Sequence, residues 1–386
     1  MTKNNGRPRI LQMITRADLG GGQVHVLDLL RGFRNEFEMV LATGEEGYCT
    51  EEAEKLGIEY HILPGLVQKI QPASDVRALW SAMRAFRAIR PDLVHCHTTK
   101  AGLVGRLAAW LSRVPVVFTA HTWCFSEGTS PVWQLVGRPA ETLAGYWANQ
   151  IITVSESNRR AAIEKGITTP EKLVTVHNGV ADHSHRARPG VDGTPRIIMV
   201  ARFVPQKNQR LLLEAVSRLR VPVILTFVGD GPLRSEVEAA ATACPSHVQV
   251  EFLGQRQDIP ELLAQSHIFA LSTNWEGFPI SILEAMRAGL PVVAADVNGV
   301  GEAVRDSENG ILVRPSDADG LYQAVDLLVT NPALRERMGA RSRLEYEQRF
   351  SVDAMLRKTA AVYETVLKRT SNKSGSRQIS ARGVAG

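Results

Sequence analysis

The sequence predicts an α/β protein made of two doubly wound halves, each built on a parallel sheet. Short β-branched runs alternate with helical patterns along the chain, which is typical of βαβ units. A polar stretch rich in glycine and proline, residues 183–195, interrupts the alternation near the middle and indicates a linker. The 386 residues are enough for two or three domains of roughly 150 residues each.

The first half, residues 1–182, contains seven predicted strands, most of them separated by helical patterns. These strands are Ile10–Thr15, Phe37–Thr43, Tyr60–Leu63, Leu93–His97, Val116–His121, Ile151–Ser155 and Val174–His177. After the fifth strand we expect an irregular excursion that carries Trp123, Trp133 and Trp147. Long excursions at that position in an α/β domain usually shape a site.

The second half, residues 196–350, has six predicted strands whose nearly continuous apolar character fits a sheet covered on both faces. They are Arg196–Ala201, Val223–Val228, Val248–Leu253, Ile268–Ser272, Val292–Ala295 and Ile311–Val313. Helices are predicted at Leu321–Val329 and Ala333–Gln348, and a last one covers residues 351–368. The basic, low-complexity residues 369–386 are predicted to be disordered. Ligands of such sheets bind beyond the carboxyl ends of the strands, where two halves would face each other across a cleft.

Composition excludes several classes of protein. With 44% hydrophobic and 22% charged residues the chain is neither disordered nor fibrous. It has no membrane-spanning apolar run and no signal-peptide pattern, and its four cysteines stand singly, so we expect a cytoplasmic protein without disulfides. The net charge of +5 arises after Glu364, where no acid follows. No basic stripe carries interleaved aromatic residues, so nucleic-acid binding is not expected.

The strongest local feature is a loop, Glu276–Pro279, between an apolar strand and a helix predicted to start near Ile280. Free N–H groups and the positive dipole end of a helix start favour a phosphate. Glu284 follows Glu276 by eight residues, which span about 12 Å of helix. Two carboxylates bracketing a phosphate site at that distance suit the two ends of a sugar nucleotide. The residues alone leave an equal alternative, in which one glutamate complements the dipole and the other is solvated.

Two further patterns suit phosphate groups. Arg202 ends the first strand of the second half and Lys207 is expected to open the next helix, and a guanidinium with an ammonium suits a diphosphate. Glycine-rich loops at Gly20–Gly22 and Gly229–Gly231 allow close approach of backbone to phosphate. Neither loop matches a dinucleotide fingerprint or a P-loop. Solvated side chains and plain tight turns are the alternatives.

Candidate metal ligands are weak. His95, His97, His121 and His177 lie at strand ends, where buried core histidines are the commoner outcome. Asp317-Ala318-Asp319 matches the D-x-D pattern of metal-dependent sugar transferases, but it opens a helix, so N-capping explains it. We therefore expect no metal and no cofactor.

In combination these motifs resemble the retaining glycosyltransferases of family 4. The resemblance is carried by Arg202 with Lys207, by Gly229-Asp230-Gly231-Pro232, by Phe252-Leu253-Gly254, and by Glu276-x7-Glu284 running on through Ala285–Val293. It covers nearly the whole chain. It implies the GT-B fold, with two Rossmann-like domains facing across a cleft and the last helix crossing back to the first. By the same resemblance, residues 1–182 would bind the acceptor and residues 196–350 the nucleotide sugar.

The resemblance implies a metal-independent hexosyltransferase and assigns roles to individual residues. Arg202 and Lys207 would hold the donor diphosphate, Glu284 the ribose and Glu276 the transferred sugar, with His121 near the reaction centre. Further donor contacts would come from Gly21, Gly22, Gly229, Gly277, Phe278, Pro279 and Ile280, and from Gln255 and Arg256 beside the base. One departure from the family pattern is Asn274-Trp275 before Glu276, where a bulky tryptophan would reshape the donor pocket.

Within the family, His95–Gly102 resembles a stretch in members that build surface polysaccharides on lipid-linked acceptors. This implies transfer of a hexose or N-acetylhexosamine, with a UDP-sugar favoured over a GDP-sugar, to a glycan or lipid-linked acceptor in exopolysaccharide, capsule or lipopolysaccharide assembly. The alternatives are a GT-B nucleotide-sugar epimerase, a transferase for a small soluble acceptor, a non-catalytic binding module, and an oxidoreductase, against which the missing dinucleotide fingerprint counts.

Residues 66–115 suggest attachment to an anionic membrane surface, at the inner face of the plasma membrane. Eight basic residues stand there against Asp75 and Asp92, and Trp80 and Phe86 share one helical stretch. The basic residues are Lys69, Arg77, Arg84, Arg87, Arg90, Lys100, Arg106 and Arg113. A solvated basic face on an ordinary domain helix is a nearly equal alternative.

Overall fold

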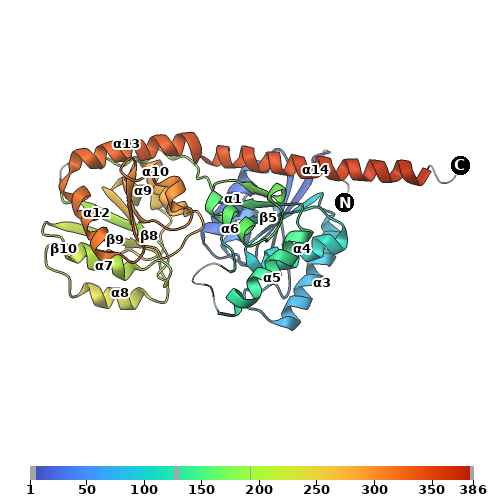
Figure 1. Cartoon of the computed structure of the whole chain (residues 1–386), viewed down its shortest axis with the longest axis horizontal. Helices are drawn as coiled ribbons and strands as arrows, with labels where there is room; N and C mark the ends of the chain where they lie inside the picture. Colours follow the sequence, from blue (N-terminus) through green and yellow to red (C-terminus); the bar gives the residue numbers. More distant parts are fainter. Residues whose placement is uncertain (1–5, 126–128, 130, 192, 383–386) are drawn as a thin grey trace. The chain divides into compact units, whose positions relative to one another are not determined.

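A computed structural model describes residues 6–125, 129, 131–191 and 193–382, apart from the side chains of residues 131–134 and 371–382. The chain divides into two compact units (Figure 1). The first unit runs to His177 and takes up the chain again from Asp353, and the second comprises Asn178–Val352.

In the described residues the first unit holds a sheet of seven parallel strands in the order β3-β2-β1-β4-β5-β6-β7. The strands are β1 (Arg9–Met13), β2 (Glu38–Thr43), β3 (Glu59–Ile62), β4 (Leu93–His97), β5 (Val116–Ala120), β6 (Gln150–Thr153) and β7 (Leu173–Thr175). The helices are α1 (Gly21–Phe33), α2 (Tyr48–Lys55), α3 (Pro72–Ile89), α4 (Thr99–Ser112), α5 (Pro131–Trp147), α6 (Glu156–Glu164) and the long α14 (Val352–Arg382). β1, β4 and β5 are almost wholly buried, as the apolar strand pattern predicts.

Helix α14 belongs to the first unit although it is the last element of the chain. Tyr363 is fully buried, and its hydroxyl lies 2.6 Å from His95 Nδ1 and 2.9 Å from Gln12 Nε2. Elsewhere on α14, Leu356 packs closely on Gly32 of α1: a Cβ on Gly32 would lie 2.3 Å from Leu356 Cδ1, so a larger residue would force the leucine side chain to move. The predicted return of the last helix to the first half is confirmed.

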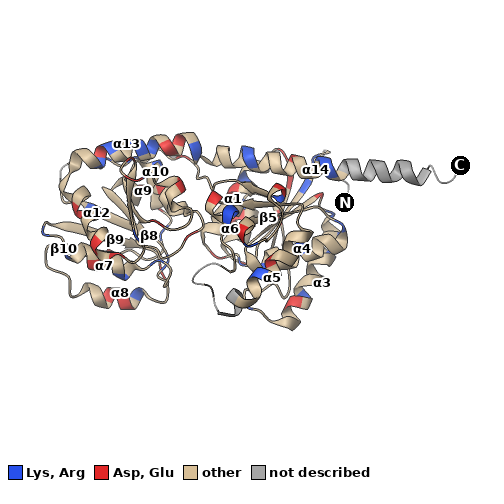
Figure 2. Cartoon of the chain, in the orientation of Figure 1, with Lys and Arg blue, Asp and Glu red and all other residues tan. Residues whose placement is uncertain are grey.

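The second unit holds a parallel sheet in the order β10-β9-β8-β11-β12-β13. Its strands are β8 (Arg196–Val200), β9 (Val223–Val228), β10 (Val248–Phe252), β11 (Ile268–Leu271), β12 (Val292–Ala295) and β13 (Gly310–Val313). Its helices are α7 (Gln209–Ser217), α8 (Arg234–Ala241), α9 (Ile259–Ala264), α10 (Ile280–Ala288), α11 (Val300–Ala303), α12 (Ala318–Thr330) and α13 (Pro332–Arg349). Acidic and basic residues are interleaved along α13 (Figure 2), where Arg343 pairs with Glu347 at 2.6 Å.

The described residues of the predicted linker, 183–191 and 193–195, belong to the second unit. The amide of Ala187 donates to the carbonyl of Ala288 at 2.8 Å. Arg335, 2% exposed, donates from Nε to the carbonyl of Pro189 at 2.5 Å and from Nη1 to the carbonyls of Leu328 and Val329. A buried guanidinium needs such acceptors, so these bonds fix the segment in place.

Both sheets reverse their strand order at one point, between β1 and β4 in the first unit and between β8 and β11 in the second. In open α/β sheets a ligand binds in the crevice at the carboxyl ends of the strands on either side of such a point. The loops that follow β1, β4, β8 and β11 are therefore where a site is expected in each unit.

Two local predictions are wrong. The stretch after β5 was expected to be irregular as far as Trp147; residues 121–125, with Trp123, are irregular, but Pro131–Trp147 forms α5, with Pro139 in its interior. Proline usually breaks a helix, so the sequence pattern did not predict α5. Composition predicted disorder after residue 368, whereas α14 is helical to Arg382. Extending an existing helix adds a hydrogen bond for each residue ordered, so polar residues can continue it.

Three residues counted toward a basic, aromatic surface at residues 66–115 are not available to it. Lys100 is 6% exposed and pairs with Asp75 at 2.6 Å. Arg106 is fully buried and pairs with Glu141 at 2.7 Å, and Phe86 is 2% exposed in the core. Trp80, in contrast, is 65% exposed. None of the described helices is long and apolar enough to span a bilayer.

Candidate active site

The loops after β8 and β11 are joined into one surface at the switch point of the second unit. The amide of Asn274 and the hydroxyl of Thr273 donate to the carbonyl of Gln206 at 2.8 and 3.0 Å. The hydroxyl of Ser272 donates to the carbonyl of Asn208 at 2.8 Å. Side chains on either loop are therefore held in a fixed relation to those on the other.

Lys207 and Glu276 meet across this surface. The ammonium of Lys207 pairs with the carboxylate of Glu276, and their side chains are only 16% and 7% exposed. Gln206 supports the pair by donating from Nε2 to the carbonyl of Trp275 at 2.7 Å. The sequence analysis singled out both charged residues but not their contact. Its expectation that Lys207 opens a helix is wrong, because α7 begins two residues later, at Gln209.

Arg202 lies on the same loop after β8 as Lys207 and is exposed. Within the described part of the chain its guanidinium has no ion-pair partner, so it is available to an anion. The glycine loop after β9 packs on the Arg202 loop backbone to backbone. A Cβ on Gly229 (φ 134°) would lie 2.2 Å from the carbonyl oxygen of Ala201, so only glycine fits. This backbone contact explains the glycine at position 229 without any role in binding phosphate.

The start of α10 follows the same surface. Pro279 precedes the first helical residue, Ile280, and no side-chain hydrogen bond caps the start of the helix. Phe278 and Gly277 are buried, and the carbonyl of Phe278 accepts a hydrogen bond from Asn178 Nδ2 at 2.9 Å. An uncapped helix start favours an anion such as phosphate, because its free N–H groups and the positive end of the helix dipole attract negative charge.

Glu284 lies one turn further along α10 and is partly buried. Burial raises the pKa of its carboxyl, and Arg287 only partly opposes this. Glu284 makes no side-chain hydrogen bond within the described residues. A desolvated carboxyl without a hydrogen-bond donor, about one turn into a helix whose start is uncapped, is a candidate for ligand contact.

Gln255 and Arg256, the two residues expected beside the nucleotide base, do not share the shielded environment of the Lys207–Glu276 pair. Gln255 and Arg256 are exposed, and the Arg256 guanidinium donates hydrogen bonds of 2.7 and 2.5 Å to the carboxylate of Asp258.

Asp317, the first residue of the D-x-D pattern, caps α12, since its carboxylate accepts a hydrogen bond from the amide of Gly320 at 2.8 Å. The N-capping interpretation of the D-x-D pattern is therefore confirmed.

In the first unit the predicted glycine loop and the predicted histidine come together. A Cβ on Gly22, in the first turn of α1, would lie 3.8 Å from His121 Nε2. Burial lowers the pKa of His121 to about 4, so the imidazole is neutral near pH 7. Gly21 is the first residue of the same helix.

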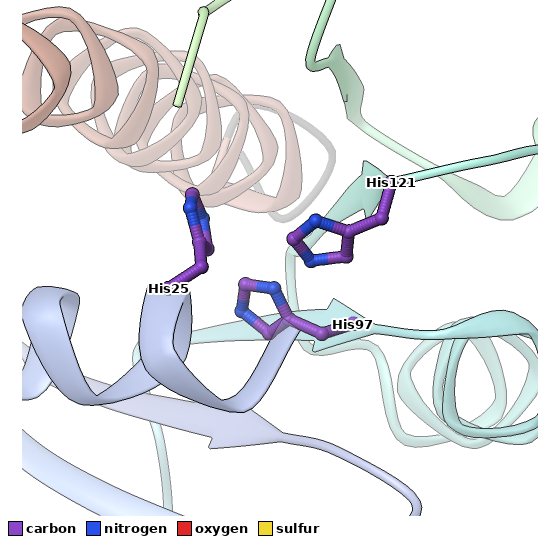
Figure 3. A group of neighbouring side chains, drawn as sticks. All are labelled: His25, His97 and His121. Atoms are coloured by element: carbon purple, nitrogen blue, oxygen red, sulfur yellow. The ribbon is translucent and has the colours of Figure 1, made fainter. Parts of the chain in front are cut away.

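The same helix, α1, brings a histidine that the sequence analysis missed. His25 of α1, 3% exposed, lies with its ring centroid 5.0 Å from that of His121 and 5.5 Å from that of His97 (Figure 3). A lone histidine on an amphipathic helix carries no spacing signal. Its position can be inferred only when the helix is docked against β4 and β5.

Comparison with known proteins agrees with this architecture. Residues 19–183 match the family model described as Glycosyltransferase Family 4, and residues 182–345 match Glycosyl transferases group 1. HepE of Anabaena, solved in complex with UDP-glucose, superposes with a TM-score of 0.80 at 23% identity, over 92% of this chain and 99% of that one. At this level of identity the superposition shows that the two proteins share a fold.

Two curated relatives extend the match in sequence. The UDP-Gal:alpha-D-GlcNAc-diphosphoundecaprenol alpha-1,3-galactosyltransferase of Escherichia coli is 29% identical over 75% of this chain and 79% of its own length. The N,N'-diacetylbacillosaminyl-diphospho-undecaprenol alpha-1,3-N-acetylgalactosaminyltransferase of Campylobacter jejuni is 22% identical over 89% of this chain and 95% of its own.

Two Rossmann-like units, with the last helix returned to the first, define the GT-B class of glycosyltransferases. The chain belongs to this class and is a glycosyltransferase, with a family 4 first half and a group 1 second half.

Proposed function

We propose that this glycosyltransferase transfers a hexose or N-acetylhexosamine from a UDP-sugar to a lipid-linked glycan, with retention of anomeric configuration and without a metal ion. The acceptor class is supported by the two relatives, whose names specify undecaprenol-diphosphate acceptors. The donor class is supported by the UDP-Gal in the name of the first and by UDP-glucose in the HepE complex. Its pathway would be surface polysaccharide assembly.

The observation that carries the proposal is the group formed by the uncapped start of α10, the Lys207–Glu276 pair and the exposed Arg202. In the proposed mechanism Arg202, Lys207 and the helix-start amides bind the diphosphate. Lys207 shifts from Glu276 to the phosphate, and the released carboxylate accepts hydrogen bonds from the sugar. Glu284 accepts hydrogen bonds from the ribose.

The bond between the anomeric carbon and the phosphate oxygen breaks as positive charge holds the leaving group. The acceptor oxygen bonds to the anomeric carbon from the same face, and its proton passes to the departing phosphate oxygen. His121 shapes the acceptor side and need not act as a base, since its neutral imidazole is paired with no carboxylate in the described residues.

The test is a transfer assay with purified protein, a panel of UDP- and GDP-sugars, and an undecaprenyl-diphosphate-linked monosaccharide, read by mass spectrometry. One hexose or N-acetylhexosamine should be added to the lipid from a UDP-sugar. Conversion of the nucleotide sugar without any acceptor would instead identify an epimerase.

We also propose peripheral attachment to an anionic membrane through α3. Its exposed face carries Trp80, Arg77, Arg84 and Arg87, beside a cavity of ≈ 690 Å³ that these residues line. Anionic lipid contributes about 1 kcal/mol per basic residue, so the binding should be sensitive to salt.

The attachment is tested by liposome flotation with wild type and Trp80→Ala/Arg84→Glu, using vesicles with and without phosphatidylglycerol at low salt. Binding should require the anionic lipid and fall in the variant. Equal binding to neutral and anionic vesicles would contradict it.

A further inference from the structure

Three histidines from three elements of the first unit surround one small space. His25 comes from α1, His97 from the end of β4 and His121 from the residue after β5, and their rings are turned toward one another (Figure 3). One ring nitrogen of each lies within 4.8 Å of one from each of the others. This group lies at the switch point of the sheet, against the first turn of α1.

A chain of hydrogen bonds sets the tautomer of His97. Gln12 donates from Nε2 to the Tyr363 hydroxyl at 2.9 Å, which leaves its Oε1 to accept from His97 Nε2 at 2.8 Å. The proton of His97 is therefore on Nε2, and its Nδ1 carries a lone pair.

That lone pair has no partner among the described residues. His97 is fully buried, and its Nδ1, like the buried Nε2 of His121, makes no hydrogen bond there. A buried polar atom normally has a partner, so two such atoms directed at one space call for a ligand.

We propose that His25, His97 and His121 bind a divalent transition-metal ion of the Zn²⁺ or Co²⁺ type. Three neutral imidazoles with a fourth position open to water form a set that such ions accept. In known histidine–metal sites the ring nitrogen that does not bind the metal donates its N–H to a carbonyl or carboxylate oxygen, which orients the ring. Gln12 Oε1 accepts the Nε2–H of His97 in the same way. With metal–nitrogen bonds of about 2.0–2.1 Å the ligand atoms of a tetrahedral ion lie roughly 3.4 Å apart, so the rings close slightly on binding.

The ion inhibits glycosyl transfer in this proposal, and that part rests on the proposed function. His121 is assigned to the reaction centre, and Gly22 of the phosphate loop packs on it. Metal ligation would tie His121 to α1 through His25 and so fix the ring that shapes the acceptor side in one position. The enzyme therefore works without the ion and is slowed by it.

The first test is titration of tag-free protein with Co²⁺, followed by visible absorption. Wild type should bind one ion with the spectrum of a four-coordinate site. His25→Phe, which keeps a ring of similar size, should weaken binding at least tenfold. The matched control is His183→Ala/His185→Ala, which removes an exposed second group of possible ligands, with His185 Nε2 3.8 Å from Glu261, and should leave Co²⁺ affinity unchanged.

Loss of binding in the control with retention in His25→Phe would overturn the assignment, as would the absence of binding in wild type. If His25→Phe does not fold, X-ray absorption of Zn²⁺-loaded wild type decides, because three imidazole nitrogens are expected and fewer contradict the site. Neither the Co²⁺ titration nor the X-ray absorption measurement requires a sugar donor. Both therefore test the metal site even if the protein does not catalyse the proposed glycosyl transfer. In the transfer assay, Zn²⁺ should slow wild type and spare His25→Phe.

Discussion

Lys207 and Glu276, 69 residues apart, form an ion pair that joins the loop after β8 to the loop after β11. The pair lies where the strand order reverses, and both side chains are largely shielded from water. The lysine proposed to bind the donor phosphate and the carboxylate proposed to contact the sugar are thus paired with each other in the structure. This coupling gives the site a measurable effect on stability.

Lys207→Met should destabilise the second unit, because it leaves the Glu276 carboxylate buried without its cation. The expected cost is about 1–3 kcal/mol by urea denaturation. Glu276→Gln in the same chain should restore part of that stability without restoring transfer. The matched control is Lys55→Met, whose 69% exposed side chain pairs with Glu52 and whose loss should cost under about 1 kcal/mol. Equal effects at the two lysines would contradict a structural role for the pair.

Glu284→Gln should separate stability from donor affinity. Because burial raises the pKa of Glu284 above its ordinary value of 4.5, its stabilising contribution is complete below that value and is lost as pH rises through the folded pKa. Glutamine carries no charge at any pH, so the variant should gain thermal stability relative to wild type as pH increases.

UDP binding to Glu284→Gln, measured by calorimetry at neutral pH, should weaken by about 1.5–3 kcal/mol, the usual value of hydrogen bonds to a charged group. An unchanged dissociation constant for UDP would remove Glu284 from the donor site. A stability difference that is independent of pH would contradict the burial of its charge.

Asp317→Ala should lower stability by about 0.5–2 kcal/mol, as expected for loss of an N-cap, and leave transfer intact. Asn331→Ala, which removes the cap of α13 at Leu334, is the matched control and should behave in the same way. Transfer should also survive excess EDTA. Loss of activity in Asp317→Ala alone, or rescue of an EDTA-treated enzyme by Mn²⁺, would make the D-x-D pattern functional.

The sheets were predictable because burial on both faces demands long apolar, β-branched runs. All of the predicted strands are present, and β4, β9 and β12 have the predicted ends. α5 was not predictable from pattern alone, because Pro139 argues against a helix that tertiary packing nevertheless supports.

The sequence also could not predict which side chains pair when they lie far apart along the chain. Lys100 and Arg106 look like surface charges in the sequence, and only packing shows that Asp75 and Glu141 neutralise them. His25 likewise has no local signal. The candidate residues Arg202, Lys207 and Glu276 were identifiable because they lie on loops that follow strands, where ligands of such sheets usually bind. Glu284 was identifiable because it lies in the helix that follows the second of these loops.

The stereochemistry of transfer tests the central claim most directly. In the proposed mechanism Arg202, Lys207 and the start of α10 stabilise the leaving diphosphate, and the acceptor attacks from that same side. The measurement is the anomeric coupling constant, by NMR, of product isolated from an α-linked UDP-sugar. An α-linked product is predicted, and a β-linked product would contradict the mechanism.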